Sequence, residues 1–82
     1  MLYMNQKPDE WSATILQHVG RNIRKMRKDA GWTINRMYAE TGIARITIER
    51  WESGKRAPKL DDILWVCKRT GWKLSEIIGG SK

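Results

Sequence analysis

The sequence contains only one cysteine and no long apolar run. A single cysteine excludes an internal disulfide and a zinc site built from several cysteines. A membrane-spanning helix needs about 18 or more mostly apolar residues in succession, and the chain has no such stretch. The N-terminus also lacks the charged region and apolar stretch of a signal peptide. We therefore expect a cytoplasmic protein.

The residue patterns of catalysis and metal binding are missing as well. The chain has no paired carboxylates, no Ser/His or Cys/His pair and no phosphate-binding loop, and its one histidine, His18, lacks a metal-ligand partner at a suitable spacing. A chain of 82 residues forms one domain with a small core and has no room for a substantial pocket. We expect no enzyme activity, metal, cofactor or small-molecule ligand, and we place His18 at the surface.

Acidic residues are few: nine Asp and Glu stand against 16 Lys and Arg, which gives a net charge of +7. Such an excess is typical of nucleic-acid-binding domains, although an anionic membrane or an acidic protein would also fit it. The positions of the basic residues are more informative, because they gather in residues 21–28 and 45–59. Clustering of this kind favours nucleic acid as the partner.

Apolar residues recur at helical spacing along most of the chain, and glycines stand at or near the ends of these segments. The pattern predicts a first helix that starts near Asp9 or Ser12 and ends before Gly31, followed by helices over 33–41, 44–53, 60–70 and 74–78. We expect residues 1–10 to form an N-terminal arm or lead-in. Residues 11–80 are expected to form a single all-α domain.

Two of these helices contain features that predict packing. In the fourth, Leu60, Ile63, Leu64 and Cys67 follow i, i+3, i+4, i+7 spacing, which predicts an apolar stripe facing the core. Gly20 lies inside the first helix, where glycine costs up to about 1 kcal/mol relative to alanine. We therefore expect Gly20 to be a point of close packing against a neighbour.

Residues 33–59 have the pattern of two short helices joined by a tight turn. Thr33 can cap the first, because its hydroxyl can accept a hydrogen bond from a free first-turn N–H. Gly42 ends that helix, because glycine adopts the left-handed conformation without steric cost. The next helix has Arg45 near its start and Arg50 in its middle. Together with the basic loop that follows, these features predict a helix-turn-helix.

Several motifs follow one another along residues 19–78: Val19-Gly20-x-x-Ile23-x-x-Met26-Arg27, Gly31-Trp32-Thr33, Gly42-Ile43, Ile48-x-x-Trp51-Glu52-x-Gly54-Lys55-x-x-Pro58 and Leu60-x-x-Ile63-x-x-x-Cys67-x-x-x-Gly71. In order and spacing they resemble the Cro and lambda-repressor family, also called the Xre family. The resemblance implies a five-helix, lambda-repressor-like fold with the helix-turn-helix at its second and third helices. It also implies a bacterial or phage-encoded protein that binds double-stranded DNA through the third helix, usually as a homodimer on a palindromic operator.

The resemblance implies that four positions of the third helix contact bases, namely Arg45, Ile46, Glu49 and Arg50. An arginine can donate two hydrogen bonds to guanine O6 and N7, and an isoleucine can contact a thymine methyl group. Glu49 can accept from cytosine N4, or orient either arginine through a salt bridge. The alternatives are solvated surface charges for the arginines and partial burial for Ile46.

A second group of residues is expected to contact phosphates, which position a domain without reading sequence. The start of the second helix offers free N–H groups and the positive end of the helix dipole, both of which favour an anion. The loop after the third helix is basic, although such a loop can also serve solubility alone. The expected phosphate contacts are Thr33, Ala44, Thr47, Lys55, Arg56 and Lys59.

The resemblance further implies a structural ion pair between Arg27 of the first helix and Glu52 of the third, which fixes the recognition helix. Two tryptophans are candidates for a dimer interface, where aromatic residues are enriched. Trp65 falls off the apolar stripe of its helix, and Trp72 lies at the joint before the fifth helix. Alternatively, Trp65 packs under residues 1–11.

The chain departs from the family pattern at several positions. Ile34 stands where the family usually has a glutamine that contacts DNA. Tyr38 stands where a small alanine is usual at a helix crossing, so either the crossing opens or the ring points aside. The usual serine or threonine caps of the third, fourth and fifth helices are replaced by Ala44, Lys59 and Lys73.

These patterns predict a sequence-specific, dimeric DNA-binding transcriptional regulator of the repressor type. A phage repressor, an antitoxin with a toxin as its protein partner, and a restriction–modification controller all fit this description. The alternative from a different class is a protein-interaction module, or a nucleic-acid-binding domain without sequence preference. The arginines in 45–50 and the basic loop favour the first hypothesis.

Overall fold

The computed structural model describes residues 9–79, which form five helices and no strand. The helices are α1 (Asp9–Asp29), α2 (Ile34–Thr41), α3 (Arg45–Glu52), α4 (Leu60–Thr70) and α5 (Leu74–Gly79). The predicted all-α, five-helix fold is therefore confirmed. Residues 1–8, which make up most of the expected arm, lie outside the described residues, and α1 already includes residues 9 and 10.

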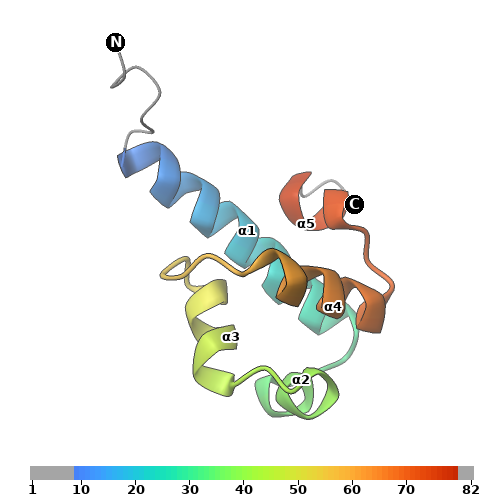
Figure 1. Cartoon of the computed structure of the whole chain (residues 1–82). Coiled ribbons are helices and arrows are strands. Elements are labelled where there is room, and N and C mark those ends of the chain that lie inside the picture. The colour runs from blue at the N-terminus through green and yellow to red at the C-terminus, as the bar shows by residue number, and fades with distance from the viewer. Residues whose placement is uncertain (1–8, 80–82) are drawn as a thin grey trace.

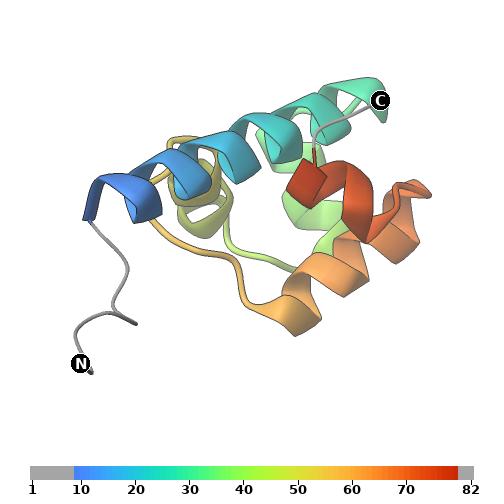
Figure 2. The same ribbon diagram turned by 90° about the horizontal axis from the view of Figure 1, so that it is seen from above.

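The long helix α1 spans the molecule, and the shorter helices lie along its C-terminal part (Figure 1). It contacts α3 and α5, while α2 contacts α3 and α4. Seen from above, α1 and α4 lie on different sides of α5 (Figure 2). This layout closes the bundle around one core and leaves the outer side of α3 free of other helices.

The turn between α2 and α3 forms for the local reasons that the sequence suggests. The Thr33 hydroxyl accepts a hydrogen bond from the Arg36 N–H at 3.0 Å and so caps α2. At the other end, Gly42 adopts φ = 78°, and its N–H donates to the Tyr38 carbonyl at 2.8 Å. Such a glycine reverses the chain within residues 42–44 and starts α3 at a fixed angle.

Every helix contributes at least one side chain to the core, which is dominated by aliphatic residues, methionine and tryptophan. The fully or nearly buried members are Ile23, Met26, Met37, Ile48, Trp51, Ile63, Val66, Cys67, Trp72 and Ile77. Burial raises the pKa of the Cys67 thiol, with a smaller contribution from the Glu76 carboxylate, so this side chain packs as a neutral apolar group.

The predicted stripe on α4 is only half right. Ile63 and Cys67 are buried, but Leu60 and Leu64 are 64% and 47% exposed, and the fully buried partner is Val66. The reason is geometric: Leu64 lies about 100° around the helix from Ile63, on its flank. Spacing alone did not reveal which of two overlapping apolar faces the neighbouring helices cover.

One further prediction is corrected by burial. Trp72, a candidate for a dimer interface, is only 8% exposed and belongs to the core, so its ring is not available to a second copy. His18 is partly exposed, and its Nε2 lies 2.9 Å from the Ile78 carbonyl oxygen. The neighbouring Asn22 side chain donates to the Ile77 carbonyl at 2.7 Å. These two contacts satisfy the end of α5 and hold it against α1.

Gly20 is the point of closest approach between α1 and the end of α3. An added Cβ would meet the carbonyl oxygens of both Trp51 and Glu52, the second at 2.9 Å. Both obstacles are backbone atoms, which cannot move aside as a flexible side chain can. The expectation of close packing at Gly20 is therefore confirmed.

We expect Gly20→Ala to lower the free energy of unfolding by about 1–3 kcal/mol, because the methyl group overpacks a backbone contact. Urea unfolding followed by circular dichroism measures this change. Gly79→Ala is the matched control, because a Cβ at that position meets nothing within 4 Å. Equal midpoints for the two variants would contradict the close contact.

Candidate nucleic-acid interface

Helix α3 has two sides with different surroundings. Ile48 and Trp51 are buried in the core. Arg45, Glu49 and Arg50 are exposed, and so is Ile46, at 53%. The partial burial considered for Ile46 is thus small, and the four positions expected to contact bases all lie on the open side of the helix.

The C-terminal end of α3 is fixed by the ion pair expected from the sequence. Arg27 Nε lies 2.7 Å from Glu52 Oε2, and Arg27 Nη2 lies 2.9 Å from Glu52 Oε1, so the pair is bidentate. Each side chain is only 10% exposed. The hydrogen bonds that Arg27 donates to the Glu52 carboxylate raise the pKa of Arg27 above its already high usual value. The remaining Arg27 Nη1 donates to the Trp32 carbonyl at 3.0 Å, which ties α1, α3 and the start of the helix-turn-helix together.

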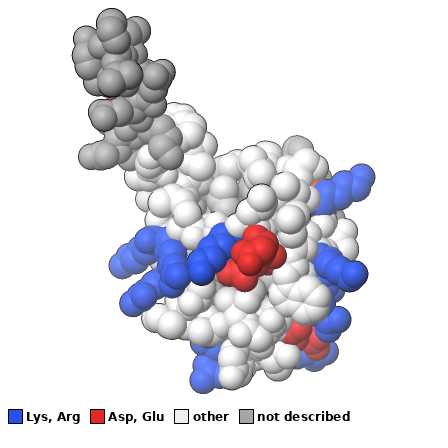
Figure 3. All heavy atoms as spheres, in the orientation of Figure 1, with Lys and Arg blue, Asp and Glu red and all other residues white. Residues whose placement is uncertain are grey.

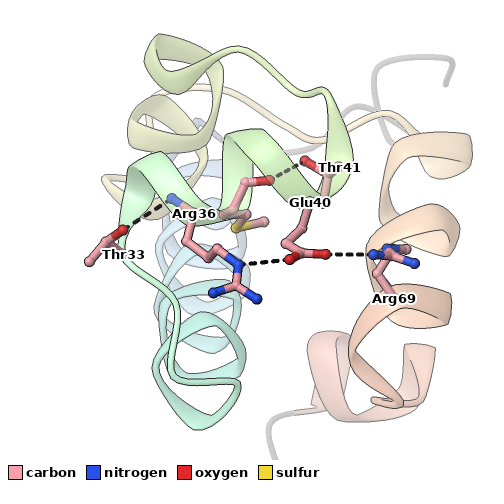
Figure 4. Close-up of polar contacts among 6 residues, drawn as sticks. Thr33, Arg36, Glu40, Thr41 and Arg69 are labelled. Carbon is pink, nitrogen blue, oxygen red and sulfur yellow. Dashed lines mark hydrogen bonds and ion pairs between the residues drawn. The ribbon is translucent and has the colours of Figure 1, made fainter.

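Helix α2 is fixed against α4 by contacts that the sequence reading missed (Figure 4). Glu40 accepts from Arg36 Nε at 2.7 Å within α2 and from Arg69 Nη2 of α4 at 2.5 Å. The i, i+4 spacing of Arg36 and Glu40 could have indicated the first of these pairs. No local spacing could have indicated Arg69, because it is distant in sequence.

Trp65 adds a second link between the same helices. Its indole Nε1–H donates to the Thr41 carbonyl at the end of α2 at 2.9 Å, and the Arg69 guanidinium lies 5.8 Å from its ring centroid. The ring remains 42% exposed. As expected, Trp65 faces outward, but its polar edge already has a role inside the fold.

The basic loop is attached to the end of α3. Gly54 turns the chain with φ = 76°, and the N–H groups of Lys55 and Arg56 donate to the Arg50 carbonyl at 2.9 and 3.3 Å. The side chains of Lys55, Arg56 and Lys59 are exposed. Basic side chains gather over this loop beside α3, with a few carboxylates next to them at the start of α4 (Figure 3).

The other positions expected to contact phosphate lie at helix starts. Thr33 is exposed and caps α2, as described above. Ala44 is exposed and gives α3 no side-chain cap, while Thr47 is partly exposed in the first turn. Ile34, which replaces the family's glutamine, packs against the core. Its side chain therefore belongs to the scaffold and not to the open surface.

Arg45, the first of the positions expected to contact bases, has a neighbour that the sequence did not predict. The Arg45 guanidinium lies over the ring of Tyr38, with Cζ 4.8 Å from the ring centroid. Tyr38 is 43% exposed, so its ring points aside and the helix crossing need not open. Within residues 9–79, Glu49 forms no ion pair, and the salt bridge considered for orienting Arg45 is replaced by the aromatic contact.

The chain matches the helix-turn-helix family over residues 23–77. No match was found among curated proteins or among solved structures. The protein belongs to the Xre, or lambda-repressor-like, family of helix-turn-helix proteins, which are DNA-binding regulators and typically not enzymes. The match covers α2, α3, α4 and the segments that join them, and so includes the whole candidate interface described above.

Two features are absent from the described part of the chain. No helix within residues 9–79 is both long enough and apolar enough to cross a membrane. In the same residues, His, Cys, Asp and Glu side chains form no group of three or more that could hold a metal ion.

The contacts of Glu40 make the stability of the α2–α4 junction depend on pH. Hydrogen bonds from Arg36 and then Arg69 lower the pKa of the Glu40 carboxyl. A lowered pKa in the folded state means that the stabilisation is complete above the unfolded value of about 4.3 and is lost as the pH falls through the folded value.

We therefore expect the free energies of unfolding of wild type and Glu40→Gln to differ at neutral pH and to converge below about pH 4. Chemical unfolding at a series of pH values measures the difference. Glu49→Gln is the control, because Glu49 is exposed and without an ion pair among residues 9–79. A difference that stays constant with pH would show that the charge of Glu40 does not stabilise the junction.

Proposed function

We propose that the protein is a sequence-specific transcriptional repressor that places α3 in the major groove of double-stranded DNA. The open side of α3 carries this proposal, because it presents two arginines, an acceptor and an apolar side chain at one surface while the opposite side is locked in the core. That set of groups matches the donors, acceptors and methyl groups of major-groove base edges. Such a repressor acts in the cytoplasm of a bacterium, and its gene is bacterial or carried by a phage.

In this proposal the bases are read by Arg45, Ile46, Glu49 and Arg50. The phosphates are contacted by Thr33, Ala44 and Thr47 at the helix starts, and by Lys55, Arg56 and Lys59 in the loop. Backbone N–H groups of the loop donate hydrogen bonds to the Arg50 carbonyl, so the loop is held in a fixed position relative to α3. A fixed distance between the two kinds of contact sets the register of α3 in the groove.

The proposed repressor is a homodimer on a palindromic operator. Because Trp72 is buried in the core, exposed Trp65 is the remaining one of the two tryptophan candidates for the interface between copies. The half-sites of such a dimer lie about 34–36 Å apart, or a multiple of this distance. Selection of bound sequences from a random DNA pool tests the whole proposal, because it yields the operator and its symmetry. No enriched sequence would contradict it, and a single asymmetric half-site would contradict the dimer.

A second candidate function is binding of a protein partner such as a toxin. It is favoured by an open apolar groove between α1, the loop before α4, and α5. The groove is lined by residues that include Ile15, Leu16, Pro58, Leu60, Leu74 and Ile78. If the chain works only as an interaction module, the random-pool selection gives no enriched sequence while the fold stays intact.

We expect Arg45→Ala to weaken binding to the selected operator by about 1–3 kcal/mol and to leave binding to random DNA almost unchanged, because a base contact supplies discrimination. Titration of both DNAs by fluorescence anisotropy measures the two affinities. Arg21→Ala is the matched control, since Arg21 is an exposed arginine on α1, outside the proposed interface. An equal loss of affinity for both DNAs would contradict the base-reading role of Arg45.

Lys55→Ala is expected to act differently. It should weaken binding to operator and random DNA by a similar factor, and lower the slope of log affinity against log salt by about one, because one phosphate contact is removed. Affinities measured at several salt concentrations give the slope. Lys68→Ala, an exposed lysine in the last turn of α4, should leave the slope unchanged. An unchanged slope for Lys55→Ala would remove Lys55 from the interface.

A further inference from the structure

The contact between Tyr38 and Arg45 joins the last turn of α2 to the first residue of α3. The guanidinium lies over the ring with Cζ 4.8 Å from the centroid, within the range of a cation–π interaction. Tyr38, Ala44, Arg45, Ile46 and Glu49 line one open depression on the surface. The contact therefore lies inside the proposed base-reading surface.

The backbone fixes the two partners relative to each other. The Tyr38 carbonyl accepts a hydrogen bond from the N–H of Gly42, and the left-handed conformation of Gly42 directs the chain into α3. Met37 makes the core contact of this part of α2, which leaves the ring of Tyr38 on the outside. Because both helices are fixed by the core, the ring stays next to the position from which Arg45 projects.

A cation–π contact can restrict an arginine without using the hydrogen-bonding edge of its guanidinium. A free arginine samples many rotamers, and ordering it on binding reduces affinity. An aromatic ring interacts with the flat face of a guanidinium, while the N–H groups point outward in its plane. Those N–H groups are the ones that donate to guanine O6 and N7. The ring can thus order the arginine side chain and leave its N–H groups available to donate to a base.

We infer that Tyr38 is a positioning residue that orders Arg45 before DNA binds and so increases discrimination at the base pair that Arg45 contacts. This inference rests on the proposed function and deepens it. From the sequence, Glu49 was the residue considered for orienting Arg45 or Arg50 through a salt bridge. The structure instead gives that role to an uncharged ring on the preceding helix.

The test compares Tyr38→Phe, which keeps the aromatic face, with Tyr38→Leu, which keeps an apolar side chain but removes the ring. The first measurement is the NMR ring-current shift of the Arg45 side chain in the free protein. It should persist in Tyr38→Phe and vanish in Tyr38→Leu. A shift that is absent from the wild type would overturn the contact itself. Thermal unfolding of each variant shows that the fold is retained.

The second measurement is a double-mutant cycle on the selected operator. Tyr38→Leu should bind the operator about two- to fivefold more weakly, as for loss of an exposed cation–π contact, and Tyr38→Phe should bind as the wild type does. In an Arg45→Ala background, Tyr38→Leu should cause no further loss. Binding to random DNA should not change in either variant.

Each other outcome of the cycle counts against the inference. An equal loss with and without Arg45 would mean that Tyr38 acts independently of it. A loss in Tyr38→Phe as large as in Tyr38→Leu would assign the effect to the hydroxyl and a direct DNA contact. If the wild type selects no operator, the proposed function fails and the role in base reading fails with it. If it selects one and Tyr38→Leu binds as well as the wild type, only the inference fails.

Discussion

The ion pair between Arg27 and Glu52 is the interaction on which the geometry of the interface depends. It joins the end of α3 to the long helix α1, and the same arginine holds the Trp32 carbonyl at the entrance to α2. A nearly buried charge left without its partner would be costly, about 3–5 kcal/mol. The pair therefore favours one arrangement of three segments over any partly docked alternative. This arrangement therefore determines the direction in which the open side of α3 faces.

Local chemistry explains why much of the fold could be predicted from the sequence. Thr33 and Gly42 set the ends of α2 through contacts within a few residues, and their roles were visible in the pattern. Burial was harder to predict, because it depends on which neighbouring helix covers a side chain. Leu64 and Trp72 show the two kinds of error: an apolar residue left exposed on a helix flank, and an aromatic residue enclosed at a joint.

For the candidate site, too, local features could be predicted from the sequence and contacts between helices could not. Ile48 and Trp51 lie at helical spacing on one side of α3, and this spacing alone predicts that Arg45 and Arg50 are exposed. The partners that hold the site together across helices did not follow from spacing. Arg69 reaches Glu40 from another helix, and Tyr38 reaches Arg45 across the turn. Only the ion pair of Arg27 was expected, and it came from the family resemblance rather than from local chemistry.

The absence of a side chain at Gly20 has a consequence for how such a protein can acquire a new target. The depth at which α3 sits on α1 is set by backbone atoms, so it does not change when the outward residues of α3 are exchanged. Under the proposed function, binding preference and folding are thus encoded at separate positions, and the outward residues of α3 can be exchanged without changing how α3 packs on α1. Arg45 is the exception, because a replacement there also leaves Tyr38 without its cation. Under the proposed function, relatives that read different operators should therefore change these two positions together.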